Sequence, residues 1–319
     1  MTTERLERLD RNPALRQSLL PFCRLSPGQI WEDPAGRHRV GVLDATRPAD
    51  LKKILAGEKP RLLVQDPPYN IAVGNANTER LSKVDLQSYL AFSHTWIENV
   101  VSTMDHDAHF YVWVGADYRE GFQPLPDLMI LMRGFEELVP RNLITMRNQR
   151  GYGTQKNWMW VRQELLHYIK GSPHFSVVYT EIPKILRGYY KRVNGKQTEN
   201  LERSRSDTIR PGNVWVDVQQ VFYRMEENVP GCYAQKPLKA IERIIASSSE
   251  EHDLVLDCFA HSGTTLLAGE NLGRRVCTFD IDPVFAEISI RRLERYRLTG
   301  KTGWQWESPF PEKPDGGGS

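Results

Sequence analysis

Short apolar runs alternate with segments of helical periodicity along most of this chain. The predicted strands are 29–32 and 37–43, which form a hairpin, then 62–64, 109–114, 143–146, 165–169, 253–256 and 275–279. The predicted helices are 49–57, 85–104, 125–134, 237–245, 264–271 and 284–297. Strands and helices in alternation are typical of a parallel sheet covered by helices on both faces. We therefore expect an α/β fold with a doubly wound, mostly parallel sheet.

The alternation breaks down between Gly171 and Val229. From Lys184 to Arg210 there are eight basic residues (Lys184, Arg187, Lys191, Arg192, Lys196, Arg203, Arg205, Arg210) and three acidic ones (Glu199, Glu202, Asp207). This local excess of positive charge, interleaved with Tyr189 and Tyr190, is what a surface that follows nucleic-acid phosphates needs. A solvated basic loop has the same composition, so this segment alone does not decide between the two.

A chain of 319 residues is long enough for one large domain with an insertion. We expect an N-terminal extension at 1–30, one domain formed by 31–170 and 231–300, and an insertion at 171–230. Residues 301–319 contain Pro309, Pro311 and Pro314 and are expected to form a disordered tail. The net charge of only +2 means that any nucleic-acid footprint is local.

The cysteine spacing and the hydropathy of the chain indicate in which cellular compartment the protein is found. Cys23, Cys232, Cys258 and Cys277 are widely spaced and form neither a metal-ligand pattern nor a disulfide framework. No apolar stretch approaches the roughly 20 residues that a membrane helix needs. We expect a soluble, cytoplasmic protein with no membrane partner and no bound metal.

The most distinctive stretch follows the strand at 62–64 and reads Asp66-Pro67-Pro68-Tyr69-Asn70. Two prolines fix the backbone and remove two amide donors, so the loop presents a carboxylate, free carbonyls and an aromatic ring. An ionised carboxylate only accepts hydrogen bonds. Such acceptors suit the exocyclic amino group of a nucleobase, while the ring of Tyr69 can stack on the base.

A second stretch, Leu254 to Thr265, reads as strand, tight loop and helix start. A glycine at such a turn lets backbone amides and a helix N-terminus approach a ligand, and Gly263 occupies that place. Asp280 ends the next predicted strand, where a carboxylate typically binds ribose hydroxyls. One glycine at this turn is common in α/β proteins, so the signal is weak by itself.

Together these motifs resemble those of the amino-group DNA methyltransferases. That family carries Asp, Asn or Ser before Pro-Pro-Tyr or Pro-Pro-Phe, and a loop Asp-x-Phe-x-Gly-Ser-Gly-Thr-Thr that binds S-adenosylmethionine. This chain has Asp-Cys-Phe-Ala-His-Ser-Gly-Thr-Thr at 257–265, with His261 in place of the first glycine. Gln235-Lys236-Pro237 and Asn213-Val214-Trp215 also match family motifs.

The resemblance implies roles for individual residues. The implied catalytic residues are Asp66, Pro67, Pro68 and Tyr69. The implied cofactor-binding residues are Asp44, Lys236, Asp257, Phe259, Ser262, Gly263, Thr264, Thr265 and Asp280. The implied DNA-binding residues are Lys184, Arg187, Lys191, Arg192, Arg203 and Arg205.

The order of the motifs resembles the permuted β subgroup, in which the catalytic loop precedes the recognition region and the cofactor loop comes last. The resemblance implies a seven-stranded sheet of the S-adenosylmethionine-dependent methyltransferase type with an inserted DNA-recognition region. Aspartate at 66 favours methylation of adenine N6 in double-stranded DNA, with the base flipped out of the duplex. Cytosine N4, RNA or protein glutamine as the substrate, and a DNA-binding relative that lost catalysis through His261, stay open. So do a partner restriction nuclease and a homodimer.

Overall fold

The computed structural model describes residues 6–68, 83–115, 123–152, 158–184, 190–199, 206–233 and 235–311. The predicted site residues Tyr69, Arg187, Arg203 and Arg205 lie outside these ranges, and only the backbone of Lys191 is described.

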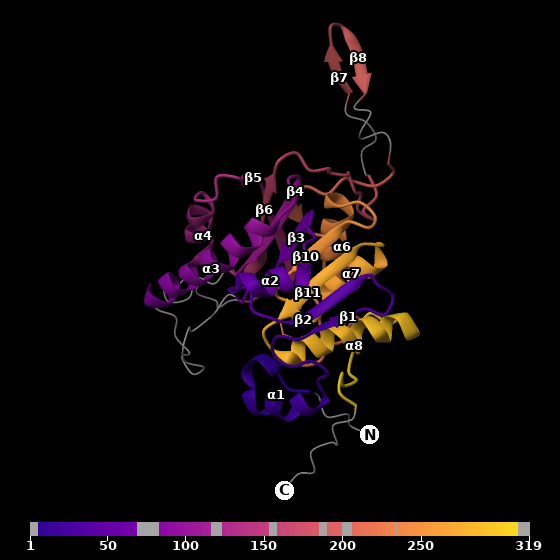
Figure 1. Cartoon of the computed structure of the whole chain (residues 1–319). Helices are drawn as coiled ribbons and strands as arrows, with labels where there is room; N and C mark the ends of the chain where they lie inside the picture. Colours follow the sequence, from indigo (N-terminus) through magenta and orange to yellow (C-terminus); the bar gives the residue numbers. More distant parts are fainter. Residues whose placement is uncertain are drawn as a thin grey trace.

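A mixed sheet of nine strands forms the centre of the protein (Figure 1), in the order β1-β2-β11-β10-β3-β4-β6-β5-β9. Its strands are β1 (Ile30–Glu32), β2 (His38–Val42), β3 (Leu62–Gln65), β4 (Ala108–Val114), β5 (Val139–Tyr152), β6 (Trp160–Lys170), β9 (Val214–Trp215), β10 (Leu254–Asp257) and β11 (Arg275–Asp280).

The seven inner strands form the predicted α/β sheet. The strands β2, β11, β10, β3 and β4 are parallel neighbours, and β6 is antiparallel to both β4 and β5. Two short strands extend this sheet at its edges, β1 antiparallel to β2 and β9 parallel to β5. The doubly wound, mostly parallel fold expected from the sequence is therefore confirmed.

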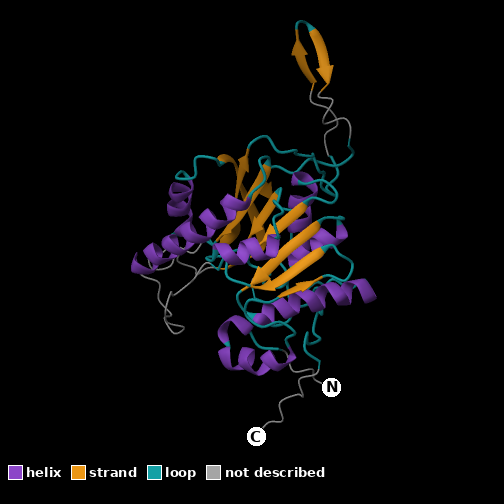
Figure 2. Ribbon diagram, in the orientation of Figure 1, coloured by secondary structure: helices purple, strands orange, loops and turns teal. Residues whose placement is uncertain are grey.

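Helices cover both faces of the sheet (Figure 2). On one face lie α2 (Pro48–Leu55), α3 (Lys83–Thr103) and α4 (Pro124–Met132), and on the other lie α6 (Leu238–Ser248), α7 (Thr264–Asn271) and α8 (Pro283–Thr299). No helix among the described residues is both long and apolar enough to cross a membrane.

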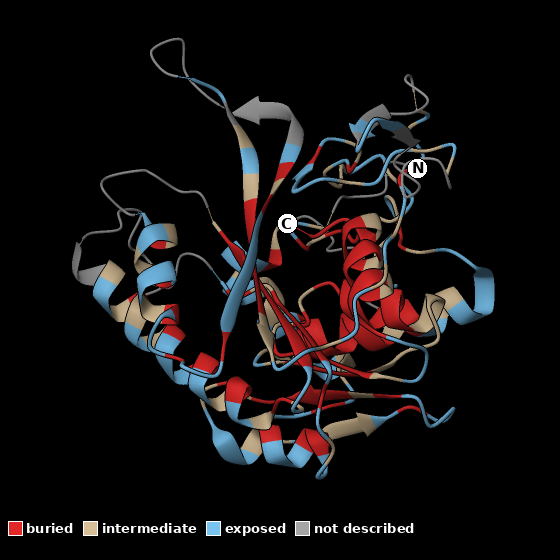
Figure 3. Ribbon diagram, turned by 90° about the horizontal axis from the view of Figure 1, so that it is seen from above, coloured by how far each residue is buried: buried red, intermediate tan, exposed pale blue. Residues whose placement is uncertain are grey.

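Alternating side chains along the strands supply the two cores. On β4, Phe110 and Val112 pack with the α3 side, whereas Tyr111 and Trp113 pack with the α6 side. This alternation follows from the period of two in a strand, and a strand buried on both faces reads as a continuous apolar run. Figure 3 shows the buried residues concentrated in the central strands and on the inner sides of the helices.

The two ends of the described chain pack together in a third core, which corrects the expectation of a disordered tail from 301 onward. Trp304 and Phe310 are buried, with relative exposures of 6% and 1%. They join Leu9 and Leu19 from the N-terminal segment, which contains α1 (Pro13–Leu19). The prolines of this segment do not prevent packing, because burial of the Trp304 and Phe310 side chains stabilises it. The high proline and glycine content of the segment hid this from the sequence interpretation.

The stretch 171–230 contributes to the main body as well as to a separate hairpin. Its strand β9 extends the sheet, and the amide of Ser176 donates to the Ser247 carbonyl of α6. The hairpin consists of β7 (Tyr190–Val193) and β8 (Lys196–Glu199), joined at Asn194-Gly195, where both residues have positive φ. Figure 1 shows it standing away from the sheet.

Candidate active site

Asp66 follows directly after the carboxyl end of β3, beside the end of β10. The side chain of Gln65 fixes this junction, because its Nε2 donates to the Leu256 carbonyl at 2.9 Å and its Oε1 accepts from the Cys258 amide at 3.0 Å. Because both polar atoms of this buried side-chain amide are hydrogen-bonded, it fixes the position of the loop after β3 relative to the loop after β10. The acid of the first motif and the loop of the second therefore lie next to each other.

The loop from Asp257 to Thr264 is shaped for close approach. Gly263 has φ of 71°, and a Cβ at this position would lie 2.8 Å from the Cα of Ser289 in α8. Only glycine meets both conditions, because other residues rarely adopt positive φ and no space exists for a side chain. The helix α7 begins immediately afterward at Thr264.

Arg292 of α8 supports this loop from behind and is completely buried. Its Nη1 donates to the Ser262 carbonyl and to Thr264 Oγ1, each at 2.9 Å, and its Nε donates to the Thr302 carbonyl at 2.6 Å. Burial lowers the pKa of this guanidinium to about 10. The sequence signal for this role is an arginine on the buried side of the last helix, and it was missed.

Lys236 lies directly opposite Asp66, just before α6. Its Nζ donates to both carboxylate oxygens, at 2.8 and 2.7 Å, and the lysine is only 5% exposed. Its backbone carbonyl accepts a bond from Thr264 Oγ1 at 3.3 Å. Lys236, predicted to bind the cofactor, thus joins the predicted catalytic residue Asp66 to the loop 257–265.

Several of the predicted residues line one small cleft. Its walls include Asp66, Lys236, Asp257, Phe259, Ser262, Thr264 and Thr265 from the predicted sets, together with His261 and Trp113. Its volume is about 20 Å³, which is roughly the space of one water molecule.

Trp113 is a residue of this cleft that sequence reasoning missed. It is fully buried, and its Nε1 has no hydrogen-bond partner in the described part of the chain. A buried indole N–H usually finds an acceptor, so this donor fits a ligand bound in the cleft. Nothing in the apolar run of β4 distinguishes this tryptophan from an ordinary core residue.

Burial changes the protonation of several groups around the loop. It raises the pKa of Asp257 to about 7, although bonds from Thr265 and the Phe259 amide oppose the shift. It lowers the pKa of His261 to about 4, so this ring is neutral at pH 7. His261 has φ of 44° and its ring contacts Phe285, with centroids 5.0 Å apart.

Three predicted cofactor residues, Gly263, Asp280 and Asp44, lie at the same edge of the sheet but outside the cleft lining. Asp280 accepts from the amides of His261 and Asp282, both at 3.0 Å, and burial raises its pKa to about 6. Asp44 accepts from the amide and hydroxyl of Thr46 at 2.9 and 2.7 Å. Both carboxylates therefore organise backbone turns in this structure.

The predicted DNA-binding residues fall into different places. Arg192 is exposed on the projecting hairpin, and the backbone of Lys191 belongs to the same strand. Lys184 is only half-exposed, and its Nζ is shielded from solvent without a hydrogen-bond partner among the described residues. The side chain of Arg192 is therefore more exposed than that of Lys184, and the DNA-binding role of both residues stays a prediction.

The comparison with protein families decides the class. Residues 61–291 match the family N6_N4_Mtase, described as DNA methylase. The chain belongs to this family. The match spans both motif loops and the region between them, and it confirms the resemblance to the amino-group DNA methyltransferases. Membership of the permuted β subgroup stays a prediction.

Two curated relatives of this DNA methylase illustrate the similarity. The type II methyltransferase M.HpaI of Haemophilus parainfluenzae is 27% identical over 235 residues, which cover 73% of this chain and 68% of the relative. The DNA adenine methyltransferase YhdJ of Escherichia coli K12 is 26% identical over 248 residues, which cover 77% and 80%.

Solved structures share the fold of this DNA methylase at lower identity. The PvuII DNA methyltransferase, described as cytosine-N4-specific, has a TM-score of 0.55 and 16% identity, covering 82% of this chain and 89% of that one. The M1.HpyAVI–SAM complex has a TM-score of 0.50 and 15% identity, covering 79% and 96%. At these identities the likeness concerns the fold.

Proposed function

We propose that this DNA methylase transfers a methyl group from S-adenosylmethionine to adenine N6 in double-stranded DNA. The observation that carries the proposal is the shared cleft, in which Asp66 of the first motif faces Lys236 and the loop 257–265 of the second. Family membership supports methylation of DNA, and the M1.HpyAVI–SAM complex supports the choice of methyl donor.

The residues of the cleft fit the proposed donor. S-adenosylmethionine carries a methyl group on a sulfonium, whose carbon–sulfur bond breaks as a new carbon–nitrogen bond forms. Ser262, Gly263 and Thr264 surround the start of α7 and would hold its polar groups, while Phe259 offers an apolar ring. The orphaned Nε1 of Trp113 supplies a further donor.

Asp66 is the group that would act on the target base. Each carboxylate oxygen accepts a bond from Lys236 Nζ, and an ionised carboxylate offers hydrogen-bond acceptors only. The exocyclic nitrogen of adenine is a poor nucleophile because its lone pair is delocalised into the ring. A carboxylate that accepts its hydrogens stabilises the positive charge that develops on this nitrogen as it is methylated.

The choice of adenine rests on aspartate at position 66, because the cytosine-N4 enzymes more often carry serine there. YhdJ, described as a DNA adenine methyltransferase, is consistent with this choice. The cytosine-N4 alternative is motivated by the PvuII enzyme, which shares the fold.

The exposed hairpin β7–β8 is proposed to contact the duplex. Arg192 and Lys196 are exposed on it, and its position away from the sheet lets it reach the phosphates beside a flipped base. A base must leave the stack before it can reach Asp66 at the sheet edge. Phosphate contacts hold the duplex during that step.

The test is to incubate the protein with S-adenosylmethionine labelled in its methyl group and with unmethylated genomic DNA, and then to identify the labelled nucleoside after digestion. N6-methyladenine is the expected product. Detection of N4-methylcytosine would show that the target base is cytosine, and it would still support methylation of an exocyclic amino group in DNA. Label in RNA or protein, with none in DNA, would contradict the proposed substrate.

A further inference from the structure

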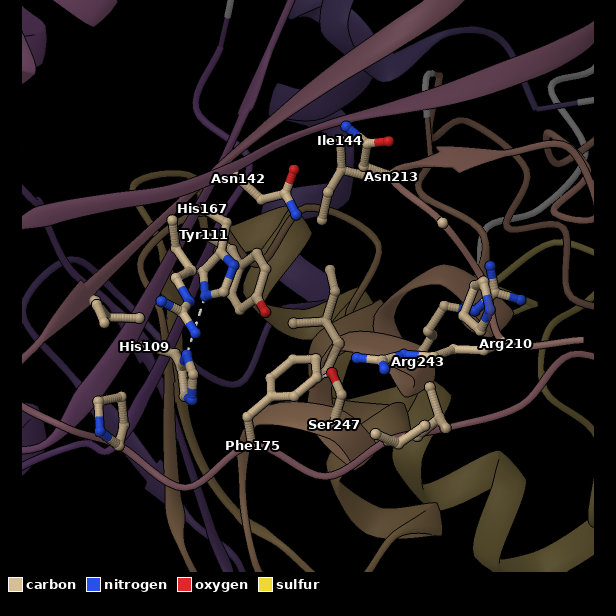
Figure 4. Close-up of a pocket in the computed structure, with 18 of the residues that line it drawn as sticks. His109, Tyr111, Asn142, Ile144, His167, Phe175, Arg210, Asn213, Arg243 and Ser247 are labelled. Atoms are coloured by element: carbon tan, nitrogen blue, oxygen red, sulfur yellow. Dashed lines mark hydrogen bonds between the residues drawn. The ribbon is translucent and has the colours of Figure 1, made fainter. Parts of the chain in front are cut away.

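A second and much larger cavity lies on the α6 side of the sheet (Figure 4), with a volume of about 680 Å³. Strands β4, β5 and β6 form its floor and α6 one wall. The segments 171–178 and 210–215 close the other sides. This volume is typical of a site for a small organic ligand.

This cavity is separate from the active-site cleft, although both lie along the same elements. On β4, His109 and Tyr111 line the cavity, whereas Trp113 lines the cleft. On α6, Ile244 and Ser247 line the cavity, whereas Ile241 lines the cleft. Because the carboxyl ends of the strands carry Asp66, the cavity occupies the opposite end of the same sheet face.

The lining of the cavity is cationic. It includes Arg141, Arg210 and Arg243 and no aspartate or glutamate. Arg243 is neutralised by its ion pair with Asp217. Arg141 and Arg210 are exposed and also line the cavity. A lining with arginines and without a carboxylate favours an anion.

A pair of buried histidines forms one end of the cavity. His109 Nε2 lies 2.8 Å from the His174 carbonyl, so it donates, and His109 Nδ1 lies 3.0 Å from His167 Nε2. If His109 is neutral, its Nδ1 accepts from His167 Nε2, which leaves His167 Nδ1 as an acceptor. Burial lowers the pKa of both rings, that of His167 to about 3, which supports this neutral pair.

The middle of the cavity is aromatic and apolar. The Tyr111 and His167 rings are stacked, with centroids 4.1 Å apart and planes at 7°. Figure 4 shows Phe175 beside Ser247 of α6, and although it is 49% exposed, it lines the cavity together with Ile144 and Ile244. An exposed phenylalanine beside an apolar wall is suited to a flat ring.

We propose that this cavity binds a nucleoside monophosphate. The base lies along the Tyr111–Phe175 wall, and His167 Nδ1 accepts a hydrogen bond from an exocyclic amino group. The phosphate lies at the other end, near Arg210, which Figure 4 shows on the side opposite His109 and His167. Guanidinium groups suit phosphate because they present paired donors.

The test is a calorimetric titration with AMP in the presence of saturating S-adenosylhomocysteine, which keeps AMP out of the active-site cleft. We expect binding to the wild type and about tenfold weaker binding to R210Q, since a charge-assisted bond is lost. F175A should also weaken AMP binding. R133Q is the matched control, because Arg133 is an exposed arginine that follows α4 on the other face of the sheet, and it should bind AMP as the wild type does.

Four outcomes would overturn the proposal. These are no AMP binding under saturating S-adenosylhomocysteine, wild-type affinity in R210Q, equal affinity for AMP and inorganic phosphate, and displacement of AMP by a short DNA duplex. Arg210 and Phe175 are both exposed, so the variants should melt at the wild-type temperature. Because the assay does not measure methyl transfer, its result is independent of the proposed function.

Discussion

Lys236 Nζ donates to both carboxylate oxygens of Asp66, at 2.8 and 2.7 Å, although 170 residues separate them in the chain. The lysine side chain is 5% exposed and the aspartate side chain 23%. A pair this enclosed is costly to break from one side, because the remaining charge stays in a poorly solvated place. A substitution at either position can therefore change both the rate of methylation and the free energy of unfolding, so both quantities have to be measured.

Asp66→Asn is expected to lower the rate of DNA methylation by about 10² to 10⁴, the range typical for loss of a positioned acid or base. Asparagine keeps the size but replaces one acceptor with a donor, which opposes the amino group of the base. The affinity for S-adenosylmethionine should stay within a factor of about three, measured by calorimetry. Near wild-type methylation in this variant would remove Asp66 from its proposed role.

Lys236→Gln is expected to show strong coupling with Asp66→Asn. If Lys236 acts through the carboxylate, the double variant should methylate DNA no more slowly than Asp66→Asn alone. The coupling free energy in unfolding should be about 0.5–3 kcal/mol, as for other residues in contact. Strictly additive effects on both rate and stability would show that the two side chains act independently.

His261→Gly is expected to tighten binding of S-adenosylmethionine. His261 lines the cleft of about 20 Å³ and occupies the position where the family usually has glycine. Glycine removes the ring and adopts positive φ without strain. Calorimetry should show a lower Kd, with Ser308→Gly in the C-terminal segment as a control. Unchanged or weaker binding would mean that the imidazole does not obstruct the cofactor.

Replacing Lys191, Arg192 and Lys196 with glutamine is expected to weaken DNA binding and to reduce its salt dependence. Each phosphate contact that is lost lowers the slope of log K against log salt concentration by about 0.9 for duplex DNA. Fluorescence anisotropy over a series of salt concentrations measures this slope. Equivalent replacement of Lys52, Lys53 and Lys59 provides a control with the same change in charge. A slope equal to that of the wild type would exclude the hairpin from the interface.

The stability of the protein is expected to fall as pH decreases below about 6.5, in part through His167. Burial lowers its pKa from 6.5 to about 3, with His109 and Arg141 also opposing its charge. The unfolded state therefore binds more protons between these values, and stability rises with pH across that window and levels off above it. Urea unfolding at pH 7, 6 and 5 gives the slope of the free energy of unfolding against pH. This slope should be smaller in H167Q than in the wild type by up to about 1.4 kcal/mol per pH unit.

Asp257 shifts in the opposite direction, since its raised pKa of about 7 makes the folded state less stable as pH rises from about 4 to 7. It is present in both proteins, so the difference between wild type and H167Q isolates the histidine. Identical pH slopes in the two proteins would show that His167 is charged or accessible in the fold.

The sequence predicted correctly those elements whose ends are set by residues adjacent in the chain. The helix Thr264–Asn271 was predicted with its observed bounds, because a strand and a glycine precede it and Gly273 follows it. The strand β5 extends to Tyr152 at one end and Val139 at the other, well beyond the predicted 143–146. Polar residues such as Arg147 and Asn148 ended the apolar pattern, but pairing with β6 sustains this strand.

Apart from Trp113, which lines the cleft itself, the site residues that sequence reasoning missed act through contacts between distant segments. Gln65 joins the ends of two strands, and Arg292 joins the last helix to the loop 257–265 and to Thr302. Neither residue belongs to a short motif, and their partners are known only once the sheet is assembled. Trp304 and Phe310 were missed for the same reason, because their neighbours come from the other end of the chain.

The adjacency of β3 and β10 has a consequence for the gene. Leu62 and Leu63 pair with Val255 and Leu256 in one parallel ladder, so backbone bonds, and not the intervening polypeptide, fix the distance between the acid and the glycine turn. A gene that encoded these two strands in the reverse order, or on two separate polypeptides that assemble, would therefore place Asp66 and the loop 257–265 in the same cleft.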